Sequence, residues 1–219
     1  MTGETEPRTP PFRFGNGPCG PHAIHTELEN GQPNCIRTIE PADEKRMRAG
    51  IARMSPRSRY LRFFSGAAAP PDWVIERLIE PDGHLHIAWG AIDTAAPGQP
   101  AIGAVHAIRP RADDRSAEFS VAVVDEYHGL GLGKLLVATI LLDARAEGLA
   151  CFNAHTLAEN RQAIDFVRSL GARRVGSDGV TLEYAIDIDE ALARLRAERD
   201  PPGIGAVFGA LENPGGALA

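Results

Sequence analysis

The chain has 219 residues, of which 43% are hydrophobic and 24% charged, and its formal net charge is −6. The acidic balance argues against bulk binding of nucleic acid, which needs a basic surface. No stretch approaches the roughly 18 consecutive apolar residues of a membrane-spanning helix, and residues 1–15 lack the apolar run of a secretory signal. These features predict a cytoplasmic protein that binds neither nucleic acid nor a membrane.

Glycine, proline and cysteine indicate how the chain is organised. Nearly half of the 23 glycines and 17 prolines lie in residues 1–33 and 201–219. Such ends predict a flexible N-terminal segment over 1–33, one domain over 34–187, and a short helix followed by a tail over 188–219. Three cysteines are an odd and sparse set, which predicts reduced thiols. The spacing of Cys and His predicts no metal site.

Hydrophobic periodicity predicts strands that alternate with helices. A helix should begin at Asp43 and Glu44, with acids in its first turn and arginines later. Ser55 has the form of an N-cap before Pro56, which predicts a second helix to about residue 64. The other predicted elements are strands over 35–40, 84–92, 101–108, 117–124, 150–157, 172–176 and 180–186, and helices over 73–79, 134–147, 160–170 and 188–199. This order favours an α/β or α+β mixed sheet flanked by helices.

The most informative stretch lies between a predicted strand and a predicted helix, where Gly129, Gly131 and Gly133 alternate. Glycine permits positive φ and close backbone approach, so successive N–H groups can point into one concavity at the helix N-terminus. The loop therefore predicts a phosphate or pyrophosphate site. A nucleoside-triphosphate loop does not fit, because His128 stands where its first glycine is required and Leu135 replaces the magnesium-binding hydroxyl. The dinucleotide pattern G-x-G-x-x-G fails in this register as well.

Together with a second block further along the chain, this loop resembles the GNAT N-acetyltransferase family. The family's loop is written Q/R-x-x-G-x-G/A, and its later motif is N-x-x-A-x-x-F-Y-x-x-x-G-F. Residues 37–44 and 54–64, with Ala117-Glu118, further resemble the GNAT domain of bacterial protein-lysine acetyltransferases. The resemblance covers about residues 35–187 and implies the GNAT fold. The matching residues are Gly131 and Gly133, with His128 in place of Gln or Arg, and then Asn160, Ala163, Phe166 and Gly171.

The resemblance implies acetyl-CoA as co-substrate and an amine as acceptor. It implies that a backbone N–H near Val123–Val124 polarises the thioester carbonyl, and that Asn160, also a potential N-cap, contacts the pantetheine arm. The residues implied for the pyrophosphate are His128, Gly129, Leu130, Gly131, Leu132, Gly133 and Lys134.

Amide formation needs a base, because a lysine-type amine has a pKa of about 10.4 and must lose a proton before it attacks. Strand alternation places Glu118 beside small residues, on the face opposite an apolar helix. With the resemblance, this predicts Glu118 as the general base. At the position of Val167, members of the family often have a tyrosine that acts as general acid for the leaving thiolate. Tyr127 and Tyr60 are the nearby candidates, although the thiolate can also leave without a protein acid.

Several alternatives stay open. The loop fits CoA whatever the acyl group, so a propionyl or succinyl transferase is an alternative. The acceptor can be a small-molecule amine in place of a protein lysine. A CoA-binding sensor without turnover is a third alternative. The basic stretch 45–62 favours a solvated helix face paired with acids over attraction of an acidic acceptor or of the CoA phosphate. His155 fits either a core position or the acceptor site. Strand edges near 84–108 and 180–186 leave a homodimer open.

Overall fold

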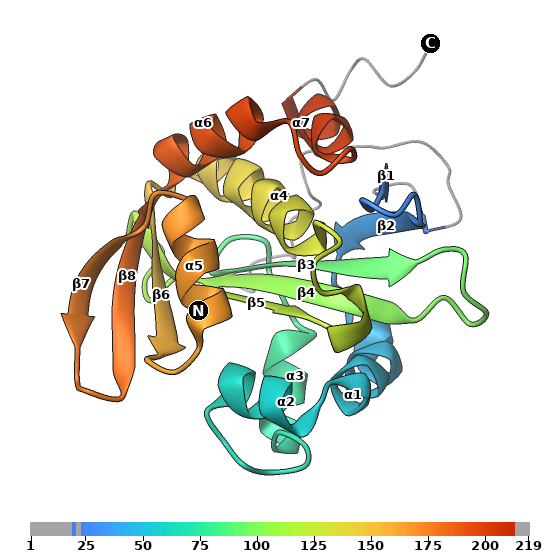
Figure 1. Cartoon of the computed structure of the whole chain (residues 1–219), viewed down its shortest axis with the longest axis horizontal. Helices are drawn as coiled ribbons and strands as arrows, with labels where there is room; N and C mark the ends of the chain where they lie inside the picture. Colours follow the sequence, from blue (N-terminus) through green and yellow to red (C-terminus); the bar gives the residue numbers. More distant parts are fainter. Residues whose placement is uncertain (1–18, 21–22, 213–219) are drawn as a thin grey trace, which may run out of the picture.

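The computed structural model describes residues 19–20 and 23–212, and its centre is one eight-stranded sheet (Figure 1). The strand order is β1-β2-β3-β4-β5-β6-β8-β7. Of the described strands, β5 and β6 are the only parallel neighbours, and every other neighbouring pair is antiparallel. The strands are β1 (Ile24–Glu27), β2 (Pro33–Thr38), β3 (His86–Asp93), β4 (Ala101–Ile108), β5 (Ser116–Val123), β6 (Cys151–Leu157), β7 (Arg173–Ser177) and β8 (Thr181–Asp187).

Helices cover both faces of the sheet. Three short helices, α1 to α3, lie on one face of β3–β5; α4 lies on the other, with α6 and α7 packed on its outer side (Figure 1). The α-helices are α1 (Glu44–Arg53), α2 (Pro56–Phe63), α3 (Asp72–Leu78), α4 (Leu132–Ala146), α5 (Arg161–Ser169), α6 (Ile188–Glu198) and α7 (Ile204–Glu212), and two 3₁₀ turns are η1 (Pro41–Asp43) and η2 (Asp125–Tyr127).

The predicted elements are all present, with ends that differ by a few residues. Ser55 caps α2 as predicted, because its side chain accepts a hydrogen bond from the Ser58 N–H. Helix α4 is buried almost all round, as its apolar sequence predicts. It is tied to the sheet by the Trp89 indole N–H, which donates to Asp143 at 2.8 Å.

The sequence prediction missed two elements, and both lie in the Pro/Gly-rich ends. The segment 1–33 was expected to be flexible and without regular structure or only loosely packed, but its residues Ile24–Glu27 form β1, an antiparallel partner of β2. The tail contains α7, whose buried residues Ile204, Val207, Phe208 and Leu211 have the i, i+3, i+4, i+7 spacing of an amphipathic helix. That spacing was visible in the sequence, although it lies close to Pro201-Pro202. Of the predicted ends, residues 1–18, 21–22 and 213–219 lie outside the described residues.

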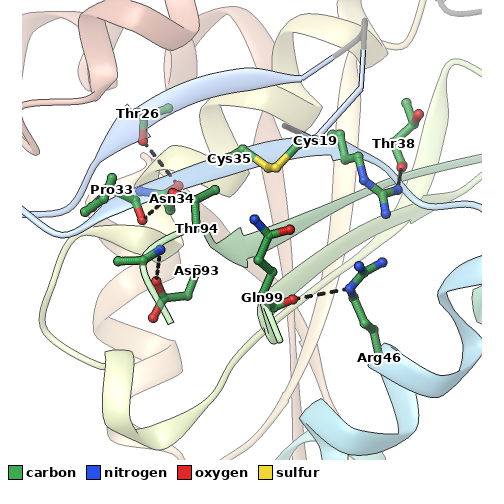
Figure 2. The surroundings of a disulfide bond; sticks show 12 residues. Cys19, Thr26, Pro33, Asn34, Cys35, Thr38, Arg46, Asp93, Thr94 and Gln99 are labelled. Atoms are coloured by element: carbon green, nitrogen blue, oxygen red, sulfur yellow. Dashed lines mark hydrogen bonds between the residues drawn. A yellow bond between two sulfur atoms is a disulfide. The ribbon is translucent and has the colours of Figure 1, made fainter. Parts of the chain in front are cut away.

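The prediction of reduced thiols was wrong for two of the three cysteines. Cys19 and Cys35 form a disulfide, and their Cα atoms are 6.7 Å apart (Figure 2). Cys35 lies on β2, and the pair packs with Ala23 and Ile92 in a small apolar cluster. Cys151 is unbridged. A count of cysteines could not predict this bridge, because the distance between two cysteines depends on how the chain turns between them.

The strands considered for a homodimer are covered by neighbouring strands rather than free. Strands β3 and β4 are central, and β8 lies between β6 and β7, so the edges are β1 and β7. Their neighbours in the sheet cover the edges near 84–108 and 180–186 that were considered for a homodimer. None of the helices in the described residues is long and apolar enough to cross a membrane.

Candidate active site

The site begins where β5 and β6 separate. The two strands pair in parallel only from Ser116 opposite Cys151 to Phe119 opposite Ala154. Both strands continue beyond this point, β5 to Val123 and β6 to Leu157, without pairing to each other. The backbone of β5 is therefore open on one side over its last four residues.

The free backbone groups of β5 point into this gap. The Val124 N–H donates to the Ile102 carbonyl at 2.9 Å, and Val123 is opposite Gly103 in the β4–β5 register. Backbone groups alternate in direction along a strand, so the N–H and carbonyl of Val123 point away from β4, toward the gap. Of the two valines predicted to polarise a carbonyl, Val123 therefore has an available N–H, and the N–H of Val124 is already bonded.

A cavity of about 460 Å³ fills the gap and extends over the glycine loop. Its walls come from the loop, α2, β5, β6 and α5, which are separated by up to about a hundred residues in sequence. Of the predicted site residues, Val124 and Leu130 alone are not part of its lining. The lining includes Glu118, Val123, Tyr127, His128, Gly129, Gly131, Leu132, Gly133, Lys134 and Asn160.

The glycine loop ends at the N-terminus of α4, and two of its three glycines have positive φ. Gly129 has φ 72° and Gly131, the N-cap of α4, has φ 79°. A Cβ at Gly131 would also lie 2.4 Å from the Pro201 Cβ, so no side chain fits there. A Cβ at Gly133 would meet Phe166 at 3.6 Å, an ordinary contact. Within the described chain, the amide N–H groups of 129–133 have no acceptor, which leaves them for an anion.

The last residue of α6 and the residues just after it pack on this loop. Lys134 bonds Glu198 at 2.7 Å and lies 3.6 Å from Asp200, and the hydrogen bond to Glu198 raises the pKa of Lys134. Lys134 was predicted as a phosphate contact, and it lines the cavity with its ammonium paired to carboxylates. Glu29, from the turn between β1 and β2, donates its N–H to the Leu130 carbonyl at 3.2 Å.

His128 joins the loop to the open strand. Its Nε2 lies 2.9 Å from the Val123 carbonyl oxygen, so this nitrogen carries the proton and donates. The family's Gln or Arg is thus replaced by a side chain that fixes the carbonyl next to the predicted thioester site.

Glu118 is exposed on β5 and faces the cavity from the α2 side, as strand alternation predicted. On the same face, Arg62 of α2 donates to the Ser120 hydroxyl at 2.9 Å. Burial lowers the pKa of Arg62 to about 10, and the charge of Glu118 acts in the opposite direction. Arg62 was not singled out in the sequence, because one arginine among seven basic residues carries no signal of its own.

Four of the other arginines in the basic stretch are paired with acids, which confirms the interpretation of a solvated helix face. The pairs are Arg46–Asp43, Arg48–Glu44 and Asp72, Arg53–Glu126, and Arg57–Glu159. Arg59 and Arg62 differ, because Arg59 donates to the Met54 carbonyl and Arg62 to a hydroxyl inside the cavity.

The Tyr127 hydroxyl is hydrogen-bonded to a residue away from the open side of β5. Its hydroxyl donates to the Asp93 carboxylate at 2.8 Å, and the tyrosine is 7% exposed. Burial and this hydrogen bond raise the pKa of Tyr127. Burial alone would raise the pKa of Asp93, but hydrogen bonds from Tyr127, Ala95, Ala96 and Gln32 hold it below its usual value.

Two further sets of hydrogen bonds lie beside the site, one between α2 and the segment before the glycine loop and one at the start of α5. Asp125, just before the loop, accepts from the Ser55 N–H and from the hydroxyls of Ser55 and Ser58 at 2.7–2.9 Å. Asn160 caps α5 by accepting from the Ala163 N–H at 3.1 Å, as predicted. His155 is exposed and lines the cavity, which excludes the core position.

Comparison with known proteins places this geometry in a family. Residues 55–172, more than half of the chain, match the acetyltransferase (GNAT) family. The acetyltransferase Pat of Mycolicibacterium smegmatis is 27% identical over 165 residues, which are 75% of this chain. The chain spans 49% of the length of that relative.

Solved structures show the same fold. The GNAT domain of S. lividans PAT superimposes with a TM-score of 0.70 at 22% identity, over 75% of this chain and 96% of that chain. A spermidine N-acetyltransferase from Vibrio cholerae, in complex with CoA and spermine, superimposes with a TM-score of 0.57 at 17% identity, over 73% of this chain and 98% of that chain. The separated strands, the loop at the N-terminus of α4 and the family match together show that this chain belongs to the GNAT acetyltransferase family.

Proposed function

We propose that the protein transfers an acetyl group from acetyl-CoA directly to a primary amine, with Glu118 as general base. The observation that carries this proposal is that one cavity brings together an unbonded strand N–H at Val123, the carboxylate of Glu118 and the donor-lined glycine loop. These are the groups that an acyl transfer needs at its carbonyl, its nucleophile and its leaving carrier.

In this scheme, the N–H groups of residues 129–133 and the N-terminus of α4 hold the pyrophosphate of acetyl-CoA. Asn160 keeps its amide N–H₂ for the pantetheine arm while its oxygen caps α5. His128 fixes the Val123 carbonyl and so orients the adjacent peptide. Lys134 contributes less, because Glu198 and Asp200 already balance its charge.

The chemical step forms a C–N bond and breaks a C–S bond. Glu118 takes a proton from the ammonium form of the acceptor, directly or through water, and the neutral amine nitrogen attacks the thioester carbonyl carbon. The Val123 N–H donates to the oxygen as negative charge develops on it. The intermediate then collapses as its nitrogen gives a second proton to the solvent, and CoA leaves as a thiolate that takes a proton from water. Arg62 assists the first step, because a nearby cation disfavours the ammonium form of the acceptor.

Tyr127 has a positioning role in this proposal. Its hydroxyl proton is donated to Asp93, so Tyr127 holds the segment before the glycine loop against the end of β3. No protein acid is required for the thiolate, which agrees with Val167 at the position where relatives often keep a tyrosine.

The test is CoA release from acetyl-CoA with a panel of amines, comprising lysine-containing peptides and small polyamines. We expect release that depends on the amine, together with a gain of one acetyl group on the acceptor by mass spectrometry. A protein lysine as acceptor predicts that peptides are better substrates than polyamines. Binding of acetyl-CoA without release from any amine would instead support a CoA-binding sensor.

A further inference from the structure

A second, smaller cavity of about 70 Å³ lies between α1 and strands β3–β5. Its walls are almost entirely apolar. The sheet side is made of small residues that lie directly opposite one another, Gly90 to Ala104 and Ala104 to Ala122. The helix side is formed by Met47 and Ile51 of α1 and by neighbouring residues. Because side chains this small leave the sheet surface uncovered under the helix, the space stays open.

This cavity adjoins the reaction centre. Met54, Ala122 and Val123 line both cavities, so the second cavity adjoins the first at these residues. Met54 is 6% exposed, and its unbranched side chain can change rotamer at little cost. Glu118 lines the first cavity and does not line the second.

We propose that the second cavity binds the acyl chain of the CoA thioester, so that the protein accepts propionyl and butyryl groups as well as acetyl and binds these longer neutral chains more tightly. This inference rests on the proposed function, in which the thioester oxygen accepts from the Val123 N–H. The sulfur then points to the glycine loop and the amine arrives from the Glu118 side. The remaining substituent of the carbonyl carbon, the acyl chain, faces Met54 and Ala122.

The size and polarity of the cavity define the chain it accepts. A methylene group occupies roughly the volume of a water molecule, about 30 Å³, so about two added carbons fill the space. The charged groups at its edge are already bonded to each other: Asp43 accepts from Arg37 at 2.6 and 2.7 Å and from Arg46 at 3.0 Å. No charged group is left for a second carboxylate, so a succinyl chain is disfavoured.

The experiment measures binding of acetyl-, propionyl-, butyryl- and succinyl-CoA to the full chain by calorimetry, without an amine. Burial of each added methylene should tighten binding about fourfold, which corresponds to about 0.8 kcal/mol, and succinyl-CoA should bind no tighter than acetyl-CoA. In Ala104→Val, the added methyl groups fill the cavity, and the affinity ratio of propionyl- to acetyl-CoA should fall to one or below. Ala193→Val, on the exposed side of α6, is the matched control and should keep the wild-type ratio.

If Ala104→Val does not fold, as judged by thermal unfolding, Gly50→Ala replaces it. Its new Cβ would have only ordinary contacts, 3.5 and 3.6 Å from Ala101, and alanine favours the helix. Equal binding of acetyl-, propionyl- and butyryl-CoA by the wild type would overturn the proposal. The proposal would also be overturned if Ala104→Val or Gly50→Ala kept the wild-type increase of affinity with acyl-chain length. Tightest binding of succinyl-CoA would overturn it as well. If amines release no CoA from any thioester, the proposed transfer fails, but the binding gradient still decides whether the cavity holds the acyl chain.

Discussion

The two sides of the active-site cavity are built from different kinds of groups. The side assigned to CoA consists mainly of backbone, namely the glycine loop, the start of α4 and the Val123 peptide. The opposite side, assigned to the acceptor, consists of side chains from α2 and β5, with Glu118, Arg62 and Ser120 at its centre.

This difference explains why the CoA side could be recognised in the sequence and the acceptor side could not. A backbone anion site depends on glycine spacing and on a following helix, which are local properties. A side-chain site depends on which elements the fold brings together, and Arg62 and Ser120 are 58 residues apart. The predictions below test whether the two sides act as independently as this division implies.

The largest effect is expected on the acceptor side, from Glu118→Gln. Loss of the base should lower kcat/KM at neutral pH by about 10²–10⁴-fold and leave acetyl-CoA binding within about twofold, as measured by steady-state kinetics and calorimetry. The defect should shrink at high pH, where the amine loses its proton unaided. Glu76→Gln, an exposed carboxylate on α3, is the control. A variant that retains full kcat at neutral pH would exclude Glu118 as the base.

The next effect concerns stability beneath the acceptor side, where His86 and His106 are buried and their ring nitrogens are 3.0 Å apart. Burial lowers the pKa of His86 from 6.5 to about 4, with Asp82 acting against the shift and Arg77 with it. Burial, His86 and Arg62 lower the pKa of His106 as well. The unfolded chain therefore binds more protons than the folded chain below pH 6.5.

The free energy of unfolding should accordingly be largest above pH 6.5 and decrease as the pH falls toward 4. Urea unfolding should show a loss of about 2 kcal/mol or more between pH 7 and pH 5. The double variant His86→Leu/His106→Leu should reduce this slope, and His25→Gln, an exposed histidine on β1, should keep it. An unchanged slope in the double variant would assign the pH dependence to other groups.

On the CoA side, substitutions of the three glycines should differ in effect. Gly131→Ala should weaken acetyl-CoA binding at least about tenfold, because the residue needs positive φ and its Cβ would collide with Pro201. In Gly129→Ala the new Cβ has free space, but alanine disfavours the positive φ of this position. We expect the affinity for acetyl-CoA to fall about fivefold. Gly133→Ala should change affinity less than about twofold. Calorimetry gives the ranking, and equal losses at all three positions would contradict it.

The smallest effect on turnover is expected for Tyr127→Phe. Removal of the hydroxyl leaves the buried Asp93 with one donor fewer, which should lower the free energy of unfolding by about 1–3 kcal/mol. The value of kcat/KM should fall less than tenfold, and so less than in Glu118→Gln. The reverse ranking of the two variants would assign the proton of the leaving thiolate to Tyr127.

Much of the fold was predictable because its elements have strong local signals. The Ser55-Pro56 cap, the apolar α4 and the glycine loop are each readable within one turn or strand. β1 was missed because four residues give too short a pattern, and α7 because neighbouring prolines masked a helical spacing that was present.

Contacts between distant segments were not predictable. The Cys19–Cys35 disulfide, the Tyr127–Asp93 bond and the His86–His106 pair each join side chains that only folding brings together. The same holds for Lys134, which the sequence offers as a phosphate contact and which is paired with Glu198, 64 residues further along the chain.

By itself, the sequence determined the order of strands and helices in the domain, the position of the glycine loop and the strand face of Glu118, because periodicity and glycine spacing act over a few residues. Only the tertiary structure decided that β5 and β6 separate after Phe119, that Val123 rather than Val124 has the available N–H, and that small residues on three strands leave a cavity beside it. These features depend on strand register and packing between distant segments, which no local pattern records.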